Sequence, residues 1–348
     1  MNKKIYCKLL LLSPFFILQS CDNPPAEKPA KPVSVVVPQI EKISTIRDSS
    51  EIKILTIDSE DYRKRMLALA HDSMTRHWPD EGPLPLFGAI LPFHRVVAYY
   101  GNFYSRYMGI LGELPEDQLI HQLNSEVEKW EIADVNTPVI PAIHYIAITA
   151  QSNPGKGNTY RLRMPENQIL KAITLSRKID GICFLDIQMG HSTVERELPT
   201  LEKYLIEKDV HLGLDPEWSM KDGTIPGKKI GTLDASDINY AVDFLSELVK
   251  KHHLPPKILV VHRFTKGMLT NSDRIKVTPE VQIVINMDGF GFEAKKRDSY
   301  KRSVSHFPVQ FTGFKLFYKN DIKSKPFRMM TPEEILELYP KPIYIQYQ

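Results

Sequence analysis

Eight short apolar segments recur between residue 95 and the end of the chain, and segments with helical periodicity separate them. Each apolar segment is continuous rather than alternating, which is typical of strands that are buried on both faces of a parallel sheet. We therefore predict eight strands, which span Arg95–Tyr100, Val139–Ile148, Gly181–Ile187, Val210–Leu214, Ile258–Val261, Val281–Met287, Phe314–Tyr318 and Ile343–Tyr347.

Between these strands, apolar residues recur at the three- and four-residue spacing of one helical face. Ser236 is placed to cap one such helix, and Thr331 followed by Pro332 is a favourable start for another. A further helix is predicted over residues 60–79. The apolar faces comprise Leu119, Leu123, Val127 and Trp130; Val194, Leu198, Leu201 and Leu205; and Ile238, Ala241, Leu245 and Leu248.

Strands that alternate with helices over about 250 residues predict a (β/α)8 TIM-type barrel, here over residues 94–348. The chain ends at the eighth strand, so we expect the 60–79 helix, within a lead-in over residues 59–93, to fill the place of the eighth helix. An open doubly wound sheet is the alternative fold. No GxGxxG segment follows the first strand, which argues against a dinucleotide-binding version of that fold.

The chain begins with a basic segment that contains Lys3 and Lys4, followed by an apolar stretch from Leu9 to Leu18. This pattern predicts an export signal over residues 1–20, too short for a permanent membrane span. The following Ser20-Cys21 resembles the lipobox of bacterial lipoproteins, which implies a lipid-modified Cys21. Residues 21–58 begin with a proline-rich stretch, typical of an extended tether. We expect an extracytoplasmic protein anchored to a membrane through Cys21.

The charge composition of the chain limits the classes of binding partner that are expected. The formal charge is +3, but the predicted signal carries three lysines and no acid, so the remainder has 42 basic and 42 acidic residues. This balance argues against a nucleic-acid partner. Loss of Cys7 with the signal and lipidation of Cys21 would leave only Cys183, so no intrachain disulfide is expected.

The predicted strands end in polar residues, and in a (β/α)8 barrel these ends form the active site. Three strand ends carry carboxylates: Asp186, then Asp215 with Glu217, and Asp288. We predict Asp215, Glu217 and Asp288 as catalytic residues. Aromatic side chains at the same level, including Tyr145, Phe264, Phe317 and Tyr318, are expected to floor a sugar-sized pocket. The predicted substrate-binding residues are Tyr100, Asp186, Gln188, Trp218, His262, Lys315 and Gln346.

Paired carboxylates beside aromatic rings are the equipment of glycoside hydrolysis, which needs one protonated and one ionised acid. The strand placement resembles retaining alpha-galactosidase-like and alpha-glucosidase-like barrels, which implies Asp215 as nucleophile and Asp288 as general acid/base. Chitinase-like barrels are a second comparison, but Gln188 stands nearest their catalytic glutamate, and an amide is no general acid. Residues 95–348 also resemble a set of bacterial lipoproteins that share the Asp-Pro-Glu-Trp strand end, which implies a barrel and a common pocket.

Several alternatives stay open at this stage. The same pocket suits a lipoprotein that binds a carbohydrate or another small ligand without catalysis, or a metal-dependent hydrolase, although no HxH or HExxH spacing supports a metal. We therefore assign no metal and no cofactor. Each site residue also has a structural interpretation. Asp186 and Asp215 are candidates to cap helices or pair with Lys315 or Arg263, and Asp288 to form a tight turn. His144 is expected to be structural.

Overall fold

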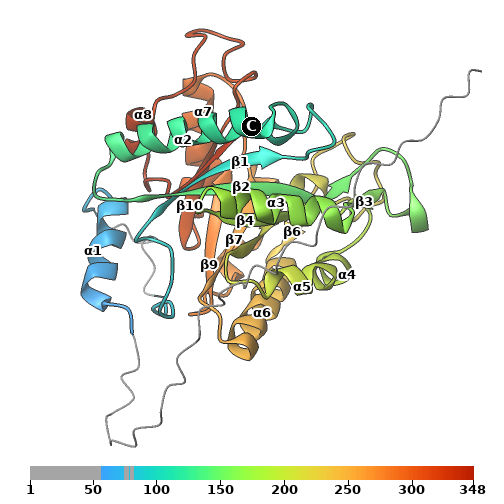
Figure 1. Ribbon diagram of the computed structural model, residues 1–348, viewed down its shortest axis with the longest axis horizontal. Helices are drawn as coiled ribbons and strands as arrows, with labels where there is room; N and C mark the ends of the chain where they lie inside the picture. The colour runs from blue at the N-terminus through green and yellow to red at the C-terminus, as the bar shows by residue number, and fades with distance from the viewer. Residues whose placement is uncertain (1–55, 74–77, 79–81) are drawn as a thin grey trace, which may run out of the picture. The chain divides into compact units, whose positions relative to one another are not determined.

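The computed structural model describes residues 56–73, 78 and 82–348, so the predicted signal, Cys21 and most of the tether lie outside the described residues. Eight parallel strands form a closed barrel, in which the first strand pairs with both the second and the last (Figure 1). The barrel strands are β1 (Arg95–Gly101), β2 (Val139–Ala150), β4 (Ile182–Ile187), β5 (Val210–Leu214), β7 (Lys257–Arg263), β9 (Val281–Met287), β10 (Phe311–Leu316) and β11 (Tyr344–Tyr347).

All eight predicted strands are confirmed, and closure of the sheet excludes the open doubly wound alternative. The short strand β3 (Arg161–Arg163) pairs with β2 in the antiparallel direction. Strand β6 (Leu233–Asp234) pairs with β8 (Leu269–Thr270) in a separate two-stranded sheet. The helices are α1 (Ser59–Leu69), α2 (Glu116–Ala133), α3 (Glu166–Lys178), α4 (Val194–Glu197), α5 (Glu202–Leu205), α6 (Ala235–His252), α7 (Glu293–Tyr300) and α8 (Pro332–Leu336). No helix in the described part of the chain is long and apolar enough to span a membrane.

Helix starts follow local side-chain chemistry. Thr331 caps α8 as predicted, and Glu334 returns the bond to its backbone in a capping box. The predicted cap at Ser236 is wrong, because Asp234 caps α6 and accepts the Ser236 N–H at 3.1 Å. A predicted helix over 194–205 divides into α4, a 3₁₀ turn and α5. Pro199 lies within that turn and has no N–H to donate.

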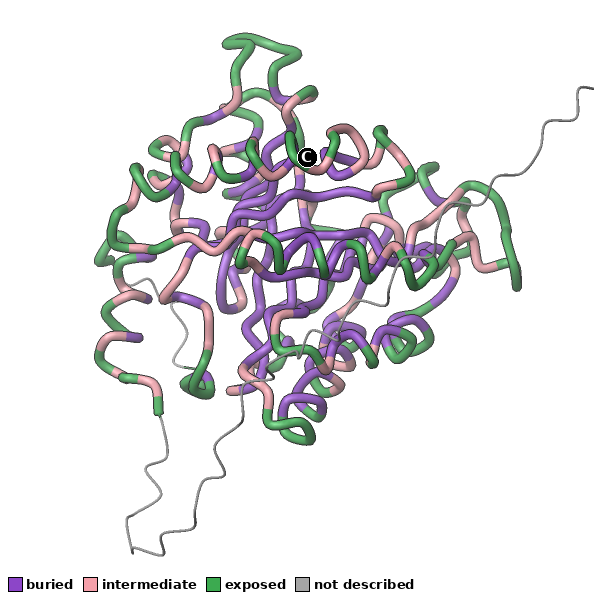
Figure 2. Tube along the Cα trace, in the orientation of Figure 1, coloured by how far each residue is buried: buried purple, intermediate pink, exposed green. Residues whose placement is uncertain are grey.

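Side-chain alternation along the strands produces two apolar cores. One set, with Val97, Leu212 and Ile285, points outward and packs under the helices. The other set, with Ala98, Phe184 and Val260, fills the inside of the barrel near its amino-terminal end. Figure 2 shows that burial continues along the strands, whereas exposed residues lie mainly on the helices and loops.

Helix α1 is shorter than the predicted 60–79 helix, because His71 and Asp72 have positive φ after the Ala70 cap. Its buried residues Met66 and Leu69 belong to the inner cluster at the amino-terminal end of the barrel. The expectation that α1 replaces the missing eighth helix is therefore wrong.

Helix α2 reaches the last strand of the barrel. Trp130 of α2 is fully buried, and its indole N–H donates to the hydroxyl of Tyr347 on β11 at 3.0 Å. Ile335 of α8 belongs to the same outward-facing cluster as these two residues. The helix after the first strand therefore also packs against the last strand.

We expect Leu69→Ala to lower the free energy of unfolding by about 2–5 kcal/mol, because it removes a buried side chain from the inner core. The matched control is Leu170→Ala in α3, where the leucine is 46% exposed and the expected change is within about 0.5 kcal/mol. Chemical denaturation followed by circular dichroism measures both. Equal small losses in the two variants would contradict the packing of α1 against the barrel.

Candidate active site

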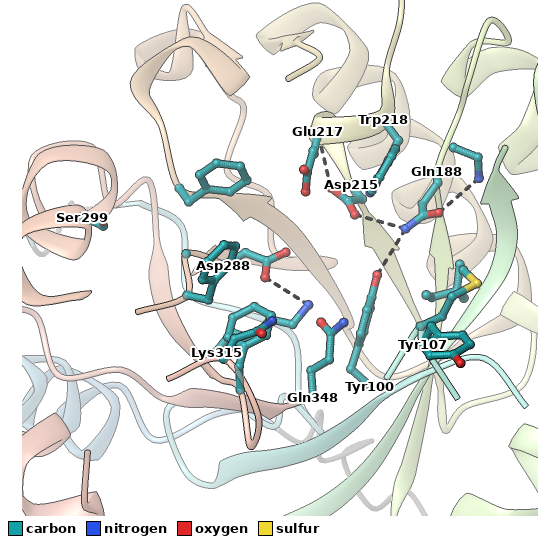
Figure 3. A pocket seen from close by; sticks show the side chains of 18 of the residues that line it. Tyr100, Tyr107, Gln188, Asp215, Glu217, Trp218, Asp288, Ser299, Lys315 and Gln348 are labelled. Carbon is teal, nitrogen blue, oxygen red and sulfur yellow. Dashed lines mark hydrogen bonds and ion pairs between the residues drawn. The ribbon is translucent and has the colours of Figure 1, made fainter. Parts of the chain in front are cut away.

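A cavity of about 570 Å³ opens at the carboxyl ends of the barrel strands (Figure 3). Its lining combines acids, amides, lysines and aromatic rings that come from the strands and from the segments that follow them. The polar lining residues are Gln188, Asp215, Glu217, Asp288, Lys295, Ser299, Lys315, Asn320 and Gln348, and the others are Tyr100, Tyr107, Met108, Ile146, Ala150, Trp218, Phe264, Gly289, Phe290 and Phe317.

The Asp215-Pro216-Glu217-Trp218 segment leaves β5 and turns at once into a 3₁₀ helix. Asp215 caps this turn, because its Oδ1 accepts the N–H of Glu217 at 3.2 Å. The Gln188 side chain donates to Asp215 Oδ2 at 3.4 Å, and its own oxygen accepts the N–H of Ala150 at 3.1 Å. Asp215 therefore both caps the 3₁₀ turn and lines the cavity, as the two predictions for this residue require.

Asp288 follows β9 and lies between two cationic side chains from neighbouring strands. Its Oδ1 is 3.0 Å from Nζ of Lys315 on β10, and its Oδ2 is 2.9 Å from Nδ1 of His262 on β7. All three side chains are almost fully buried. The pairing with Lys315 is drawn in Figure 3, where Asp288 lies across the cavity from Asp215 and Glu217.

These surroundings separate the acids electrostatically. Burial raises the pKa of Asp215 well above its usual value, and the nearby carboxylate of Glu217 raises it further. Burial and the charge of Asp288 raise the pKa of Glu217 to about 7. Burial also acts to raise the pKa of Asp288, but Lys315 and His262 outweigh it and hold that pKa below its usual range. Below pH 7 the surroundings thus favour an ionised Asp288 facing protonated Asp215 and Glu217.

A second polar layer lies directly beneath the cavity floor, inside the barrel. The hydroxyl of Tyr100, a lining residue, donates to Oδ2 of the fully buried Asp186 at 3.1 Å. His144 and His262 flank the other oxygen of this carboxylate. Burial acts to lower the pKa of His262, but Asp288 and Asp186 raise it to about 10.

The structure divides the predicted site residues between these two layers. The cavity is lined by all three predicted catalytic acids and by Tyr100, Gln188, Trp218 and Lys315. The other predicted binding residues, Asp186, His262 and Gln346, are buried below it and do not line the cavity. The catalytic and binding roles of all the predicted site residues stay predictions.

Two predicted aromatic platforms are misplaced. Tyr145 points to the helix side of β2 and stacks on Phe103 with ring centroids 4.9 Å apart. Tyr318 stacks on Tyr347, and its hydroxyl donates to Glu126 at 3.2 Å. Strand alternation explains Tyr145, since its neighbour His144 points inward and adjacent residues face opposite sides.

The cavity also has lining residues that the sequence did not single out. Gln348 could have been found, because it shares the side of the last strand with Gln346. Ser299 lies on α7, and the others lie in loops after the strands, where no periodicity indicates direction: Tyr107, Met108, Phe290 and Asn320.

No protein-family model and no curated protein sequence matches this chain. Among matching solved structures is mannanase man26 of Bacillus subtilis, with 11% sequence identity and a TM-score of 0.39. The match covers 84% of this chain and 88% of the mannanase chain. A likeness at this level carries no inference about the reaction.

The raised pKa of Glu217 predicts a loss of stability at rising pH. The ordinary value is 4.5 and the folded value about 7, so the folded state binds the proton more tightly than the unfolded chain. The resulting stabilisation is complete below pH 4.5 and is lost as pH rises through 7, which amounts to about 3 kcal/mol.

We expect Glu217→Gln to remove this part of the pH dependence, because the amide has no proton to lose. Unfolding midpoints in denaturant, measured between pH 4.5 and 8, test the prediction. The matched control is Glu128→Gln, which changes an exposed glutamate of α2 and should keep the wild-type profile. A Glu217→Gln profile that also matches wild type would disprove the raised pKa.

Proposed function

We propose that this protein is a membrane-anchored glycoside hydrolase that acts on extracytoplasmic carbohydrate at the mouth of the barrel. One observation carries the proposal: Asp288, paired with Lys315 and His262, faces two acids whose pKa values burial raises, Asp215 and Glu217, across a cavity lined by aromatic rings. Glycoside hydrolysis requires this combination of a carboxylic acid and a carboxylate.

The local charges favour a division of roles different from the one implied by the resemblance to alpha-galactosidase-like barrels. Glu217 is the general acid, because its pKa of about 7 lets it both hold and release a proton near neutral pH. Asp288 is the carboxylate that attacks the sugar or activates water, since Lys315 holds it ionised. Asp215 positions Glu217 through the hydrogen bond to the Glu217 backbone N–H.

Aromatic side chains around the acids support a sugar as the ligand. Trp218, Phe264, Phe290 and Phe317 line the same cavity as the carboxyl groups. Flat aromatic faces pack against the C–H faces of sugar rings, while the amides and Lys295 at the wall suit hydroxyl groups. A cavity of about 570 Å³ is large enough for a small oligosaccharide portion.

A carbohydrate-binding protein without catalysis is the second candidate. The observation that favours it is the full engagement of Asp288, whose two oxygens already face Lys315 and His262 at 3.0 and 2.9 Å. A carboxylate held this way is a weaker nucleophile. The metal-dependent hydrolase receives less support, because the metal-capable group found in the described part of the chain lies below the cavity floor.

Single amide variants test the enzyme proposal. We expect Glu217→Gln and Asp288→Asn each to lower turnover by at least about a hundredfold, because each removes one half of the acid–carboxylate pair. Products from a panel of cell-wall and dietary glycans are measured by mass spectrometry. Asp222→Asn, which changes an exposed loop carboxylate, should keep wild-type turnover.

Calorimetric titration with the same glycans separates the two candidates. Retained binding in the amide variants, together with lost turnover, supports the enzyme. Glycan binding by the wild-type protein without any product would instead support the binding protein and exclude the hydrolase.

The anchor is tested separately. We expect Cys21→Ser to abolish incorporation of labelled palmitate and to release the protein from the membrane fraction, because the lipid is attached to that sulfur. The control Cys7→Ser should keep both, since Cys7 leaves with the signal. Continued labelling of Cys21→Ser would rule out lipidation at this position.

A further inference from the structure

Three metal-ligand side chains converge inside the barrel, one layer below the cavity floor. They are His144 of β2, Asp186 of β4 and His262 of β7, and none is exposed. Nε2 of His144 lies 3.3 Å from Oδ1 of Asp186, and Nε2 of His262 lies 3.5 Å from the same oxygen. The three atoms all lie within 4.8 Å of one another.

Each of these side chains is held in place by its other polar atom. Nδ1 of His144 is 2.6 Å from the hydroxyl of Tyr344, and Oδ2 of Asp186 accepts from Tyr100 at 3.1 Å. Nδ1 of His262 is 2.9 Å from the Asp288 carboxylate. Metal-binding histidines are oriented in this way, with the second ring nitrogen paired to a carboxylate, hydroxyl or carbonyl group.

The converging atoms themselves have no hydrogen-bond partner among the described residues. This holds for both Nε2 atoms and for Oδ1 of Asp186, each with essentially no exposed surface. Unpartnered polar atoms are costly in a protein interior. The two Nε2 atoms approach Oδ1 at 3.3 and 3.5 Å without hydrogen-bond geometry, so the group calls for a cation. A cation between them would satisfy all three.

We propose that His144, Asp186 and His262 bind a zinc ion inside the barrel. Ligand atoms that lie 2.0–2.1 Å from zinc at tetrahedral angles are about 3.3–3.4 Å apart, close to the two nitrogen–oxygen distances observed. Two imidazoles and one carboxylate are a ligand set that zinc uses in proteins.

Gly213 of β5 leaves room beside this group. A Cβ atom at this position would lie 2.3 Å from Oδ1 of Asp186 and 2.4 Å from Nε2 of His144. Both values are too short for a carbon contact, so any larger residue would displace the two ligand atoms. Because Gly213 has no side chain, the donor atoms of Asp186 and His144 can occupy this space.

The zinc ion would act through its neighbours rather than on the substrate. It would neutralise the buried Asp186 carboxylate and fix the ring of His262, whose other nitrogen contacts Asp288 at the cavity. A proton on His262 is the competing cation, because the ring lies between two carboxylates. Zinc binding does not depend on glycoside hydrolysis, and its test needs no substrate.

Metal content of the full-length protein decides between the zinc ion and the proton. The protein is purified in detergent without chelators, through a tag that contains no histidine, and analysed by mass spectrometry of the elements. We expect one zinc per chain, lost on dialysis against a strong chelator and regained with Zn²⁺ alone. Co²⁺ in its place should give the visible absorption bands of a tetrahedral site.

Variants locate the ion. His144→Gln and Asp186→Asn should each lower zinc content at least about tenfold at a fixed free Zn²⁺ concentration. His211→Gln is the matched control: His211 is also buried inside the barrel with an unpartnered Nε2, but it lies outside the group and should keep full zinc content.

Two outcomes would overturn the proposal: a wild-type chain that retains no zinc after exposure to excess Zn²⁺, or ligand variants that retain as much zinc as wild type. Circular dichroism checks the fold of each variant. If a ligand variant does not fold, the cobalt spectrum of the wild-type protein decides, because the absence of tetrahedral bands contradicts the site.

Discussion

The protonation of the acids in this site depends on the balance between buried carboxyl groups and buried cationic side chains. Four carboxyl groups, those of Asp186, Asp215, Glu217 and Asp288, meet at the carboxyl end of the barrel and in the layer beneath. Among the described side chains, Lys315 and His262 pair with them at 3.5 Å or less as cations. An unpaired buried charge is costly, so two cationic side chains alone cannot keep all four carboxyl groups ionised. The two carboxyl groups without a cation, Asp215 and Glu217, are the two with raised pKa values.

The barrel scaffold makes this meeting possible. Parallel strands in a closed barrel place inward-facing residues of distant segments at the same level around one axis. His144 and Asp186 lie on neighbouring strands, and His262 comes from a strand on the far side of β5. Barrel interiors are usually filled by branched apolar side chains, as the amino-terminal half is here with Val260 and Val284. Toward the mouth of the barrel the interior side chains become polar. These polar side chains contact the residues of the site, whereas the apolar ones form the core.

Much of the fold can be predicted from the sequence, because strands buried on both faces of a parallel sheet consist of continuous apolar segments. The same logic placed Asp215, Glu217 and Asp288 at one end of the barrel, since polar residues follow those runs directly. It fails for Tyr145, because the neighbouring His144 faces the barrel interior and Tyr145 therefore faces the helices.

Other features need the three-dimensional neighbours. The Ser236 cap was wrong by two residues, because Asp234 and Asp237 form a reciprocal capping box that competes for the same N–H groups. Division of the acids into ionised and protonated groups depends on the contact between Lys315 and Asp288, which lie on different strands. Loop residues such as Phe290 carry no periodic signal, so their place at the cavity could not be derived.

The central claim is that the acids across the cavity differ in protonation, and neutron diffraction from deuterated crystals tests it most directly. The measurement is made about one pH unit below 7, the value to which the pKa of Glu217 is raised. The account predicts deuterium on the carboxyl groups of Glu217 and Asp215 and none on Asp288. Deuterium on Asp288, or its absence from both Glu217 and Asp215, would contradict the account.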